Sequence, residues 1–394
     1  MLAKHIFKDI NHACNFILNK EKSLLEKRHS PLVISPHRAL KSNPLQIFVN
    51  DADDDKFVMT RLQSGRYSLK PNLRNRYYLF RGQNKYFNPS KPSMFRSGAQ
   101  RFLLENIAYQ EMFYTIYSHP LVQLLDAGIV LQGQKFSFEM NIYGLSQHYY
   151  NKTTLMDMTS SEEVAKFFAV TDYSAENDCY TPHVQNGIGV LYYYEIEFDS
   201  FWKDQLRTIG LQVFPRSFLQ KGFLRDMSKT ENFNDLPKVS AVKFYHNANI
   251  SRKIFDKFHG GKDLFPIDIL EKHWKNRSNN VISQVTFDYN ARNNPHDNIL
   301  RNRWELEEKG WRIADYSPSF SSDELHSYYQ DIKNGWWEEF CSKIFIPVDR
   351  DGSFMKDMLS IENLPEYGWA FKEEVNRPDD FKMGMVGKEL YPTC

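Results

Sequence analysis

The chain has 394 residues, enough for two domains or for one large domain with an insertion, and its 50 basic residues nearly balance its 49 acidic ones. This balance argues against a protein that binds nucleic acid through its overall charge. Four scattered cysteines without metal-binding spacing predict a reducing cytoplasm, and the absence of an apolar run of about 18 residues predicts no membrane partner.

The first predicted region comprises residues 1–75. Apolar residues recur at helical spacing over residues 3–28 and predict an amphipathic helix that packs on the main domain. Residues 29–75 contain several prolines and an acidic run at Asp51, Asp53, Asp54 and Asp55. The oxygens of this run could hold a divalent cation, although a solvated loop is the simpler interpretation.

The second predicted region, residues 76–275, begins with a strand. Its β-prone run ends on Arg81, Gly82 and Gln83, so the strand presents a guanidinium at its edge and the backbone can then turn. Arginine offers a rigid fork that matches phosphate or carboxylate. A helix is predicted to follow from about residue 100 to residue 118.

Residues 144–169 are the part of the chain with the most reactive side chains. We expect a polar strand or loop that ends at the start of a helix. Ser160 or Ser161 can cap this helix, and Glu162 and Glu163 in its first turn suit the helix dipole. Free N–H groups and hydroxyls at a helix start favour an anion.

Two further side chains of this stretch have alternative interpretations. His148 is either a general base or ligand donor, or a residue that holds the loop by bonding a backbone carbonyl. Asp157 lies among apolar residues, so it is expected to be partly buried and paired with Arg81 or His148. A purely structural ion pair would also explain it.

The remainder of the second region alternates strands and helices. Strands are predicted at residues 187–198 and 239–245, and helices at residues 250–258 and 267–275. Between the two strands, Arg216 could bind phosphate or carboxylate, or pair with an acidic core residue.

The third predicted region, residues 276–394, is expected to form an additional α/β subdomain. Its predicted elements are strands near residues 281–289 and 343–347 and helices near residues 300–309 and 323–340. Paired tryptophans at Trp336 and Trp337 could stack on bases, but core packing is the simpler interpretation.

The sequence resembles the FRG domain family, whose Phe-Arg-Gly signature stands at residues 80–82. The resemblance continues through residues 92–96 and is strongest from Gln147-His148-Tyr149 to residues 167–169. Weaker matches follow at residues 215–223 and 264–266. The usual Gly-Leu-Pro-Thr-Arg segment of the family is Tyr-Asn-Lys-Thr-Thr here, so its arginine is missing, and Met158 replaces the usual tryptophan.

A looser resemblance is to the ADP-ribosyltransferase fold, which places an arginine on an early strand, a Ser-Thr-Ser-like element before a helix, and a glutamate near a final strand. Arg81, residues 159–161 and Gln220 would correspond. The resemblance implies an α+β fold whose core is a mixed or antiparallel sheet with helices. Gln220 cannot act as a base or stabilise positive charge, so the expected glutamate is missing.

Together the residues and the resemblances imply a nucleotide site with NAD as its ligand. Its predicted catalytic residues are His148, Asp157 and Gln220. Its predicted ligand-binding residues are Arg81, Gly82, Gln83, Tyr149, Thr159, Ser160 and Arg216. Arginine would neutralise phosphates, hydroxyls would meet a ribose, and an aromatic ring such as Tyr78, Tyr149 or Phe167 could stack on a base.

Three functions follow as hypotheses. The first is an ADP-ribosyltransferase-like enzyme or NAD-processing effector that acts on an unidentified protein or nucleic acid, such as a toxin or phage-defence protein. The second is a catalytically silent module that senses a nucleotide or nucleic acid. The third is a metal-dependent nuclease that uses the acidic run and His148. The sequence leaves the oligomeric state open.

Overall fold

The structure is a computed structural model. The residues that it describes are 2–27, 56–61, 66–73, 75–96, 102–127, 129–131, 134–196, 206–276, 280–293, 299–331, 339 and 342–345. The acidic run at residues 51–55 and the paired tryptophans lie outside these ranges.

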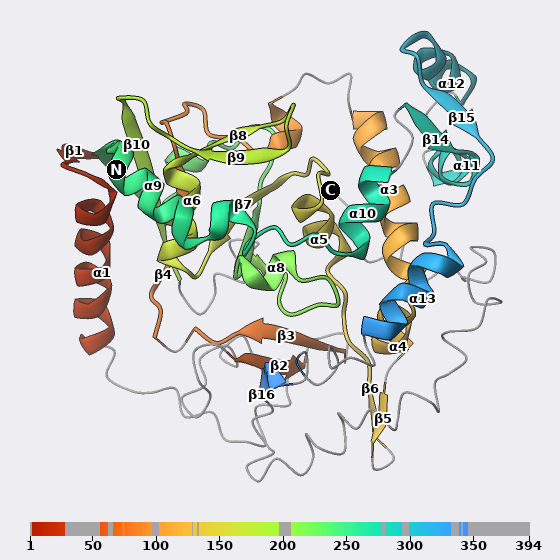
Figure 1. Cartoon of the computed structure of the whole chain (residues 1–394), viewed down its shortest axis with the longest axis horizontal. Coiled ribbons are helices and arrows are strands. Elements are labelled where there is room, and N and C mark those ends of the chain that lie inside the picture. The colour runs from red at the N-terminus through yellow and green to blue at the C-terminus, as the bar shows by residue number, and fades with distance from the viewer. Residues whose placement is uncertain are drawn as a thin grey trace. The chain divides into compact units, whose positions relative to one another are not determined.

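A mixed seven-stranded sheet is the largest sheet of the described chain, with the strand order β1-β13-β10-β4-β7-β12-β11 (Figure 1). β1 runs parallel to β13, and the other neighbouring pairs are antiparallel. The strands are β1 (Leu2–Phe7), β4 (Tyr78–Gln83), β7 (Leu155–Thr159), β10 (Ile188–Glu195), β11 (Leu206–Thr208), β12 (Gly222–Asp226) and β13 (Val239–Tyr245). This α+β arrangement agrees with the predicted fold class at that level.

Four smaller sheets complete the described strands. They are formed by β2 (Phe57–Arg61), β3 (Tyr67–Pro71) and β16 (Ile344–Phe345); by β5 (Ile129–Leu131) and β6 (Gln134–Phe136); by β8 (Thr171–Ser174) and β9 (Cys179–Pro182); and by β14 (Val281–Ser283) and β15 (Arg312–Ala314).

The described residues also form α-helices. They are α1 (Ile10–Lys27), α3 (Phe102–Tyr117), α4 (Pro120–Ala127), α5 (Ile142–His148), α6 (Glu162–Ala169), α8 (Arg216–Leu219), α9 (Ala248–Lys257), α10 (Ile269–Asn276), α11 (Gln284–Asn293), α12 (Ile299–Glu308) and α13 (Ser322–Asp331). Within the described residues, no helix combines the length and the apolar character that crossing a membrane requires.

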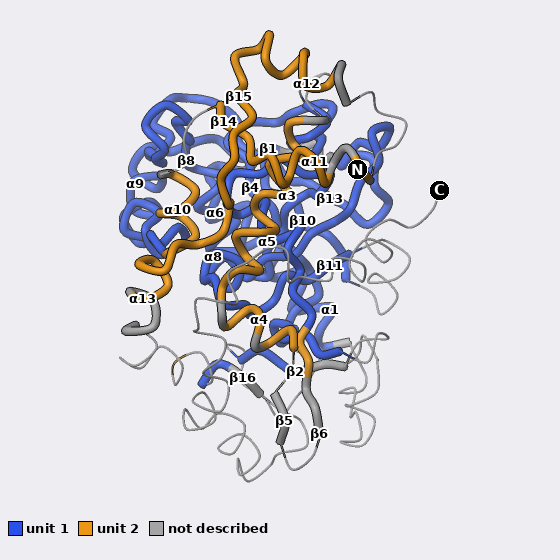
Figure 2. Tube along the Cα trace, turned by 90° about the vertical axis from the view of Figure 1, so that its right-hand side faces the viewer, with its two compact units in different colours: residues 1–102, 139–268, 342–355 blue, residues 103–138, 269–341, 356–394 orange. Residues whose placement is uncertain are grey.

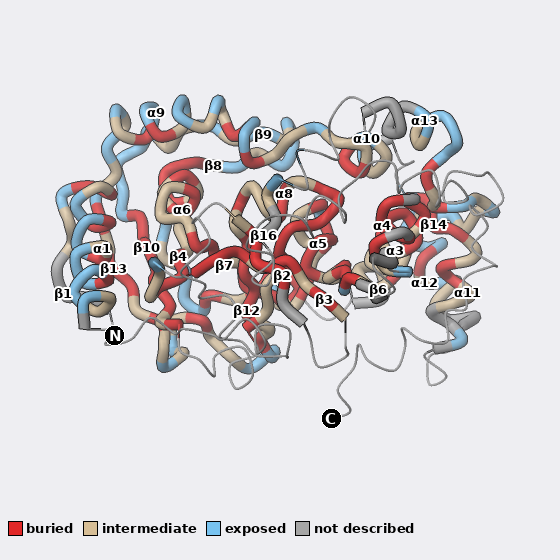
Figure 3. The backbone as a smooth tube through the Cα atoms, turned by 90° about the horizontal axis from the view of Figure 1, so that it is seen from below, coloured by how far each residue is buried: buried red, intermediate tan, exposed pale blue. Residues whose placement is uncertain are grey.

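The large sheet buries apolar side chains on both faces because successive residues of a strand point to opposite sides. Tyr78 and Phe80 of β4 belong to a core shared with α1 and α6, whereas Leu79 joins the core on the other face. Figure 3 shows buried residues concentrated along β4, β7 and β12, while α9 carries many exposed ones. The strands nearest the middle of the sheet are therefore held on both sides.

The predicted cap of α6 is confirmed at Ser161. Its hydroxyl accepts a hydrogen bond from the Val164 N–H at 3.3 Å. Glu162 and Glu163 occupy the first turn, and Val164 and Phe167 face the core. Local sequence therefore places α6 against the sheet with its start beside β7.

Several sequence expectations need correction. The chain does not begin as one helix over residues 3–28: it first forms β1, which pairs with β13, and α1 begins at Ile10. The stretch before β7 is not only strand or loop, because residues 142–148 form α5, capped by Asn141. The strand predicted over residues 281–289 is only β14, after which the chain turns into α11.

The chain divides into two compact units (Figure 2). Unit 1 comprises residues 1–102, 139–268 and 342–355, and unit 2 comprises residues 103–138, 269–341 and 356–394. The boundaries of these units differ from those of the predicted regions 1–75, 76–275 and 276–394. Residues 103–138 fall within the predicted middle region but belong to unit 2. The large sheet belongs to unit 1, and β14 and β15 belong to unit 2.

Unit 2 contains a buried histidine that should make folding sensitive to acid. His119 has no exposed surface, and its Nδ1 accepts a hydrogen bond from the Leu121 N–H at 3.2 Å, at the start of α4. Burial lowers the pKa of His119 from its ordinary 6.5 to about 3. The folded protein therefore binds fewer protons than the unfolded chain between these two values.

We expect the free energy of unfolding of unit 2 to be highest above about pH 6.5 and to fall as pH decreases toward about 3, by up to about 1.4 kcal/mol per pH unit. The variant His119→Asn retains an acceptor near the Nδ1 position but no titrating ring, so its pH dependence should be flatter. Urea unfolding at several pH values measures both slopes. Equal slopes would contradict this assignment.

Candidate functional site

A cavity of about 370 Å³ lies at the junction of β4 and β7 in unit 1, and we call it the β4–β7 cavity. These two strands share one registered pair, Phe80 with Thr159, and the neighbouring residues of both strands line the cavity. The volume is at the lower end of the roughly 300–1,000 Å³ that ligand pockets occupy. Its charged lining residues are Arg81, Arg96 and Asp157.

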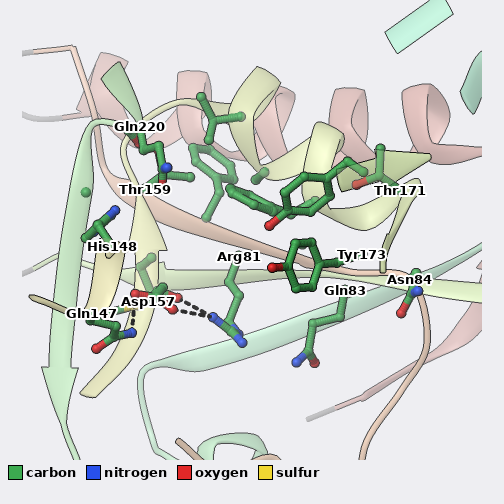
Figure 4. A pocket seen from close by; sticks show the side chains of 18 of the residues that line it. Arg81, Gln83, Asn84, Gln147, His148, Asp157, Thr159, Thr171, Tyr173 and Gln220 are labelled. Atoms are coloured by element: carbon green, nitrogen blue, oxygen red, sulfur yellow. Dashed lines mark hydrogen bonds and ion pairs between the residues drawn. The ribbon is translucent and has the colours of Figure 1, made fainter. Parts of the chain in front are cut away.

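Arg81 reaches from β4 toward β7. Its Nη1 donates a hydrogen bond to the backbone oxygen of Asp157 at 2.8 Å and lies 3.9 Å from the carboxylate Oδ2 of the same residue. Figure 4 shows the two side chains directed toward one another. Burial lowers the pKa of Arg81, the Asp157 carboxylate opposes this effect, and Arg96 adds to it. A partly buried guanidinium beside a cavity favours an anionic ligand.

Asp157 is partly buried, as the sequence predicts, and half of its side-chain surface is accessible. Arg81 is confirmed as a partner, but a second partner, Gln147, was not predicted. Its Nε2 donates a hydrogen bond to Asp157 Oδ1 (Figure 4). The carboxylate is thus held from the α5 side through one oxygen, while the other oxygen faces Arg81 across a longer gap.

His148 lies at the end of α5 and lines the cavity. Burial lowers its pKa below the ordinary value, the Asp157 carboxylate opposes this effect, and Arg216 strengthens it. Nε2 makes no hydrogen bond within the described residues and lies close to Gly222, where an added Cβ would stand 3.2 Å from it. A neutral imidazole in this position can accept a proton.

Aromatic rings form another wall of the cavity. Tyr173 of β8, Tyr180 of β9 and Phe265 line it, and the rings of Tyr180 and Phe265 stack with centroids 4.9 Å apart. Tyr173 is 48% exposed, so its ring remains accessible to a ligand. Tyr78, Tyr149 and Phe167, the aromatics that the sequence suggested for stacking, are instead fully buried and do not line the cavity.

The hydroxyl cluster expected at the ribose holds the junction between β7 and α6. Thr159 lines the cavity, but its Oγ1 donates to the Gln220 backbone oxygen at 2.7 Å and accepts from the Ser161 N–H at 3.0 Å. Ser160 is buried outside the lining, and its N–H donates to the Lys221 oxygen. These groups therefore hold the local structure between β7 and α6.

The start of α6 is not open to an anion in the way the sequence suggested. Glu162 pairs with Arg76 at 2.5 Å, and Glu163 pairs with Lys166 and with Lys257. These carboxylates already occupy the positive end of the helix dipole. Arg81 and Arg96 are accordingly the cationic groups that line the cavity.

Gly82, Gln83 and Gln220 also line the cavity. The backbone of Gly82 packs directly against α6. A Cβ added at Gly82 would fall 1.8 Å from the Ala165 backbone oxygen. Gln83 is buried, and its Oε1 makes no hydrogen bond within the described chain. Gln220 is 7% exposed and its Nε2 donates to the Leu264 oxygen at 3.0 Å. Its amide is therefore tied to the neighbouring loop.

Tyr149 and Arg216 lie behind the cavity and do not line it. The Tyr149 hydroxyl donates to Asp268, and the Arg216 guanidinium lies 4.5 Å above the centre of the Tyr149 ring. Arg216 is 3% exposed and donates from Nη1 to the His148 backbone oxygen at 3.1 Å. This pair supports the end of α5, where His148 is placed.

The structure adds lining residues that sequence reasoning did not assign a role. Gln147 and Arg96 line the cavity and belong to the motifs on which the family resemblance rests. Their place in these motifs was the sequence feature that could have identified them as site residues. Burial lowers the pKa of Arg96, whereas Asp157 opposes this effect. Tyr173 and Tyr180 carry no local signal, since only the β8–β9 pairing brings them to the cavity.

Comparison with known families identifies residues 76–178 as matching the FRG domain. The matched segment contains β4, α5, β7 and α6, and thus most of the polar cavity lining. No match to this chain was found among curated proteins or among solved structures.

Proposed function

We propose that this protein, whose residues 76–178 are an FRG domain, binds a nucleotide in the β4–β7 cavity and processes NAD as an ADP-ribosyltransferase-like enzyme. Its acceptor would be a protein or nucleic acid, as in a toxin or phage-defence effector. The observation that carries the proposal is that the partly buried guanidinium of Arg81 lies 3.9 Å from the carboxylate of Asp157 in one cavity.

Each side of this arrangement suits part of a nucleotide. Arg81 and Arg96 outnumber the single lining carboxylate and would neutralise phosphate groups. The wall formed by Tyr173, Tyr180 and Phe265 offers ring faces for a planar base. A cavity that combines aromatic side chains with polar groups able to fix a ligand's orientation is the usual form of a small-molecule site.

Cleavage of the bond between nicotinamide and ribose develops positive charge on the sugar. Asp157 supplies a carboxylate that would stabilise this charge, the role that the ADP-ribosyltransferase fold normally gives to a glutamate. His148, held neutral by burial, would accept the proton of the attacking hydroxyl or water. Gln220 would contribute only a neutral amide, and its Nε2 already donates to the Leu264 backbone oxygen.

The first test uses the full-length protein and NAD labelled on its adenylate, alone and with protein, DNA or RNA acceptors. Nicotinamide release and label transfer are followed together. Release supports the enzyme. Without release, protection of the fold against heat by NAD would support the silent sensing module, which the bound amide of Gln220 specifically favours. The absence of both nicotinamide release and heat protection would overturn the nucleotide proposal.

Removal of the Arg81 guanidinium should weaken NAD binding by about 100-fold, because a charge-assisted hydrogen bond contributes about 1.5–3 kcal/mol. Titration calorimetry on Arg81→Ala measures this. Arg207→Ala is the matched control, since Arg207 pairs with Asp226 at 3.1 Å and does not line the cavity. Equal affinity of Arg81→Ala and the wild type for NAD would show that Arg81 does not bind this ligand.

The metal-dependent nuclease remains a hypothesis from the sequence, because its acidic run lies outside the described residues. Degradation of DNA or RNA that stops on addition of EDTA would favour it. Degradation unaffected by EDTA would count against the metal.

A further inference from the structure

A chain of hydrogen bonds with one fixed direction ends at the carboxylate of Asp157. The Leu155 backbone N–H donates to Thr153 Oγ1 at 3.1 Å, and the Thr153 hydroxyl donates to Gln147 Oε1. Gln147 Nε2 then donates to Asp157 Oδ1. The two side chains that carry the chain are well covered, since Thr153 is fully buried and Gln147 is partly buried.

The direction follows from the chemistry of each group. A backbone N–H can only donate, so the Thr153 oxygen accepts from Leu155 and its hydroxyl proton is available for Gln147. The Gln147 oxygen is thereby engaged, and only the NH₂ end of its amide can face Asp157. The opposite amide orientation would place the Gln147 oxygen against Asp157 Oδ1 and so bring two acceptors together.

We infer that Gln147, oriented by Thr153, is a positioning residue that holds the Asp157 carboxylate with one oxygen directed to the β4–β7 cavity. Oδ1 is taken by the amide, while Oδ2 lies 3.9 Å from Arg81 Nη1, a distance that leaves room for a ligand group to approach.

The consequence for catalysis rests on the proposed function, but the hydrogen-bond chain itself does not. A carboxylate that must stabilise positive charge on a sugar has to remain ionised and has to keep its orientation as the ligand enters. Half of the Asp157 side chain is exposed, so burial alone does not fix its rotamer. The hydrogen bond from Gln147 restricts the Asp157 rotamer, which burial alone does not.

The test measures the orientation of the Asp157 side chain directly and needs no ligand. In full-length protein, the three-bond couplings from the backbone ¹⁵N and ¹³C′ to the carboxyl ¹³C of Asp157 report its χ1 rotamer, and the signal is assigned by its loss in Asp157→Asn. In Gln147→Met, which keeps the side-chain length but removes the donor, we expect these couplings to move from the values of one rotamer toward the averaged values of several. Thr153→Val should cause a smaller move in the same direction, and Thr153→Ser should restore the wild-type couplings.

The outcomes separate the two proposals. Unchanged couplings in Gln147→Met, with the fold confirmed by its thermal midpoint, would overturn the positioning role even if NAD is cleaved. Averaged couplings without any NAD turnover would support the positioning role and leave the failure with the proposed function. If Gln147→Met does not fold, Thr153→Val decides the question, because unchanged couplings there would show that Thr153 does not orient the amide.

Where NAD turnover is present, the kinetic constants give a second reading. Gln147→Met should lower kcat while KM stays near that of the wild type. A rise in KM that accounts for the whole loss would instead assign Gln147 to ligand binding.

Discussion

Gly82→Ala is expected to lower the free energy of unfolding by more than about 3 kcal/mol and to displace α6 from the sheet. An added Cβ would stand 1.8 Å from the Ala165 oxygen and 2.7 Å from the Ala169 nitrogen. Both atoms belong to the helix backbone, so no side-chain rotation can relieve the overlap. Since domains are stable by only about 5–15 kcal/mol, a large share of the protein's stability should be lost.

Gly187→Ala is the matched control for this prediction. The nearest atom to an added Cβ there is His246 Cδ2 at 3.6 Å, an ordinary contact distance. Thermal and urea unfolding should place this variant within about 0.5 kcal/mol of the wild type. Comparable stability of the two variants would mean that α6 does not pack on β4 as closely as described.

The conversion Asp157→Asn should reduce NAD turnover by about 10³-fold while NAD affinity changes only a few-fold. The amide has nearly the same shape, and its oxygen can still accept the hydrogen bond from Gln147. It lacks the charge that would stabilise positive charge on the ribose. The loss should therefore be confined to the chemical step, which single-turnover nicotinamide release measures separately from binding.

Asp263→Asn serves as the control, because Asp263 pairs with His259 at 2.8 Å and does not line the cavity. Wild-type turnover in Asp157→Asn would exclude Asp157 from catalysis. A loss of affinity that accounts for the whole loss of activity would instead assign Asp157 to ligand binding, together with Arg81.

The sequence predicted correctly those elements whose causes are local. β4 follows from its run of β-prone residues, α6 follows from the Ser161 cap and the spacing of Val164 and Phe167, and the long strand β10 follows from the β-branched and aromatic run between glycines. The family match over residues 76–178 includes the residues quoted for the resemblance at 80–82, 92–96 and 147–169, whereas those at 215–223 and 264–266 lie outside it.

Local patterns were less reliable where a distant partner determines the structure. β1 is a strand because β13 offers a parallel edge, although its sequence continues the helical spacing of α1. The β-branched and aromatic residues after β14 favour a strand, yet α11 forms there and buries Phe287 against Ile282 and Leu306. Tertiary packing overrides the weak intrinsic preference of a short segment.

The sequence by itself determined the family resemblance, and the residues of that resemblance include Arg81, His148 and Asp157, which all line one cavity. Only the tertiary structure decided which neighbours share the cavity. Asp268 and Arg216 bury Tyr149, Gln220 and Lys221 engage Thr159 and Ser160, and the β8–β9 pairing supplies Tyr173. The physical reason is that the direction and partners of a side chain depend on strand pairing between distant segments, which no local pattern encodes.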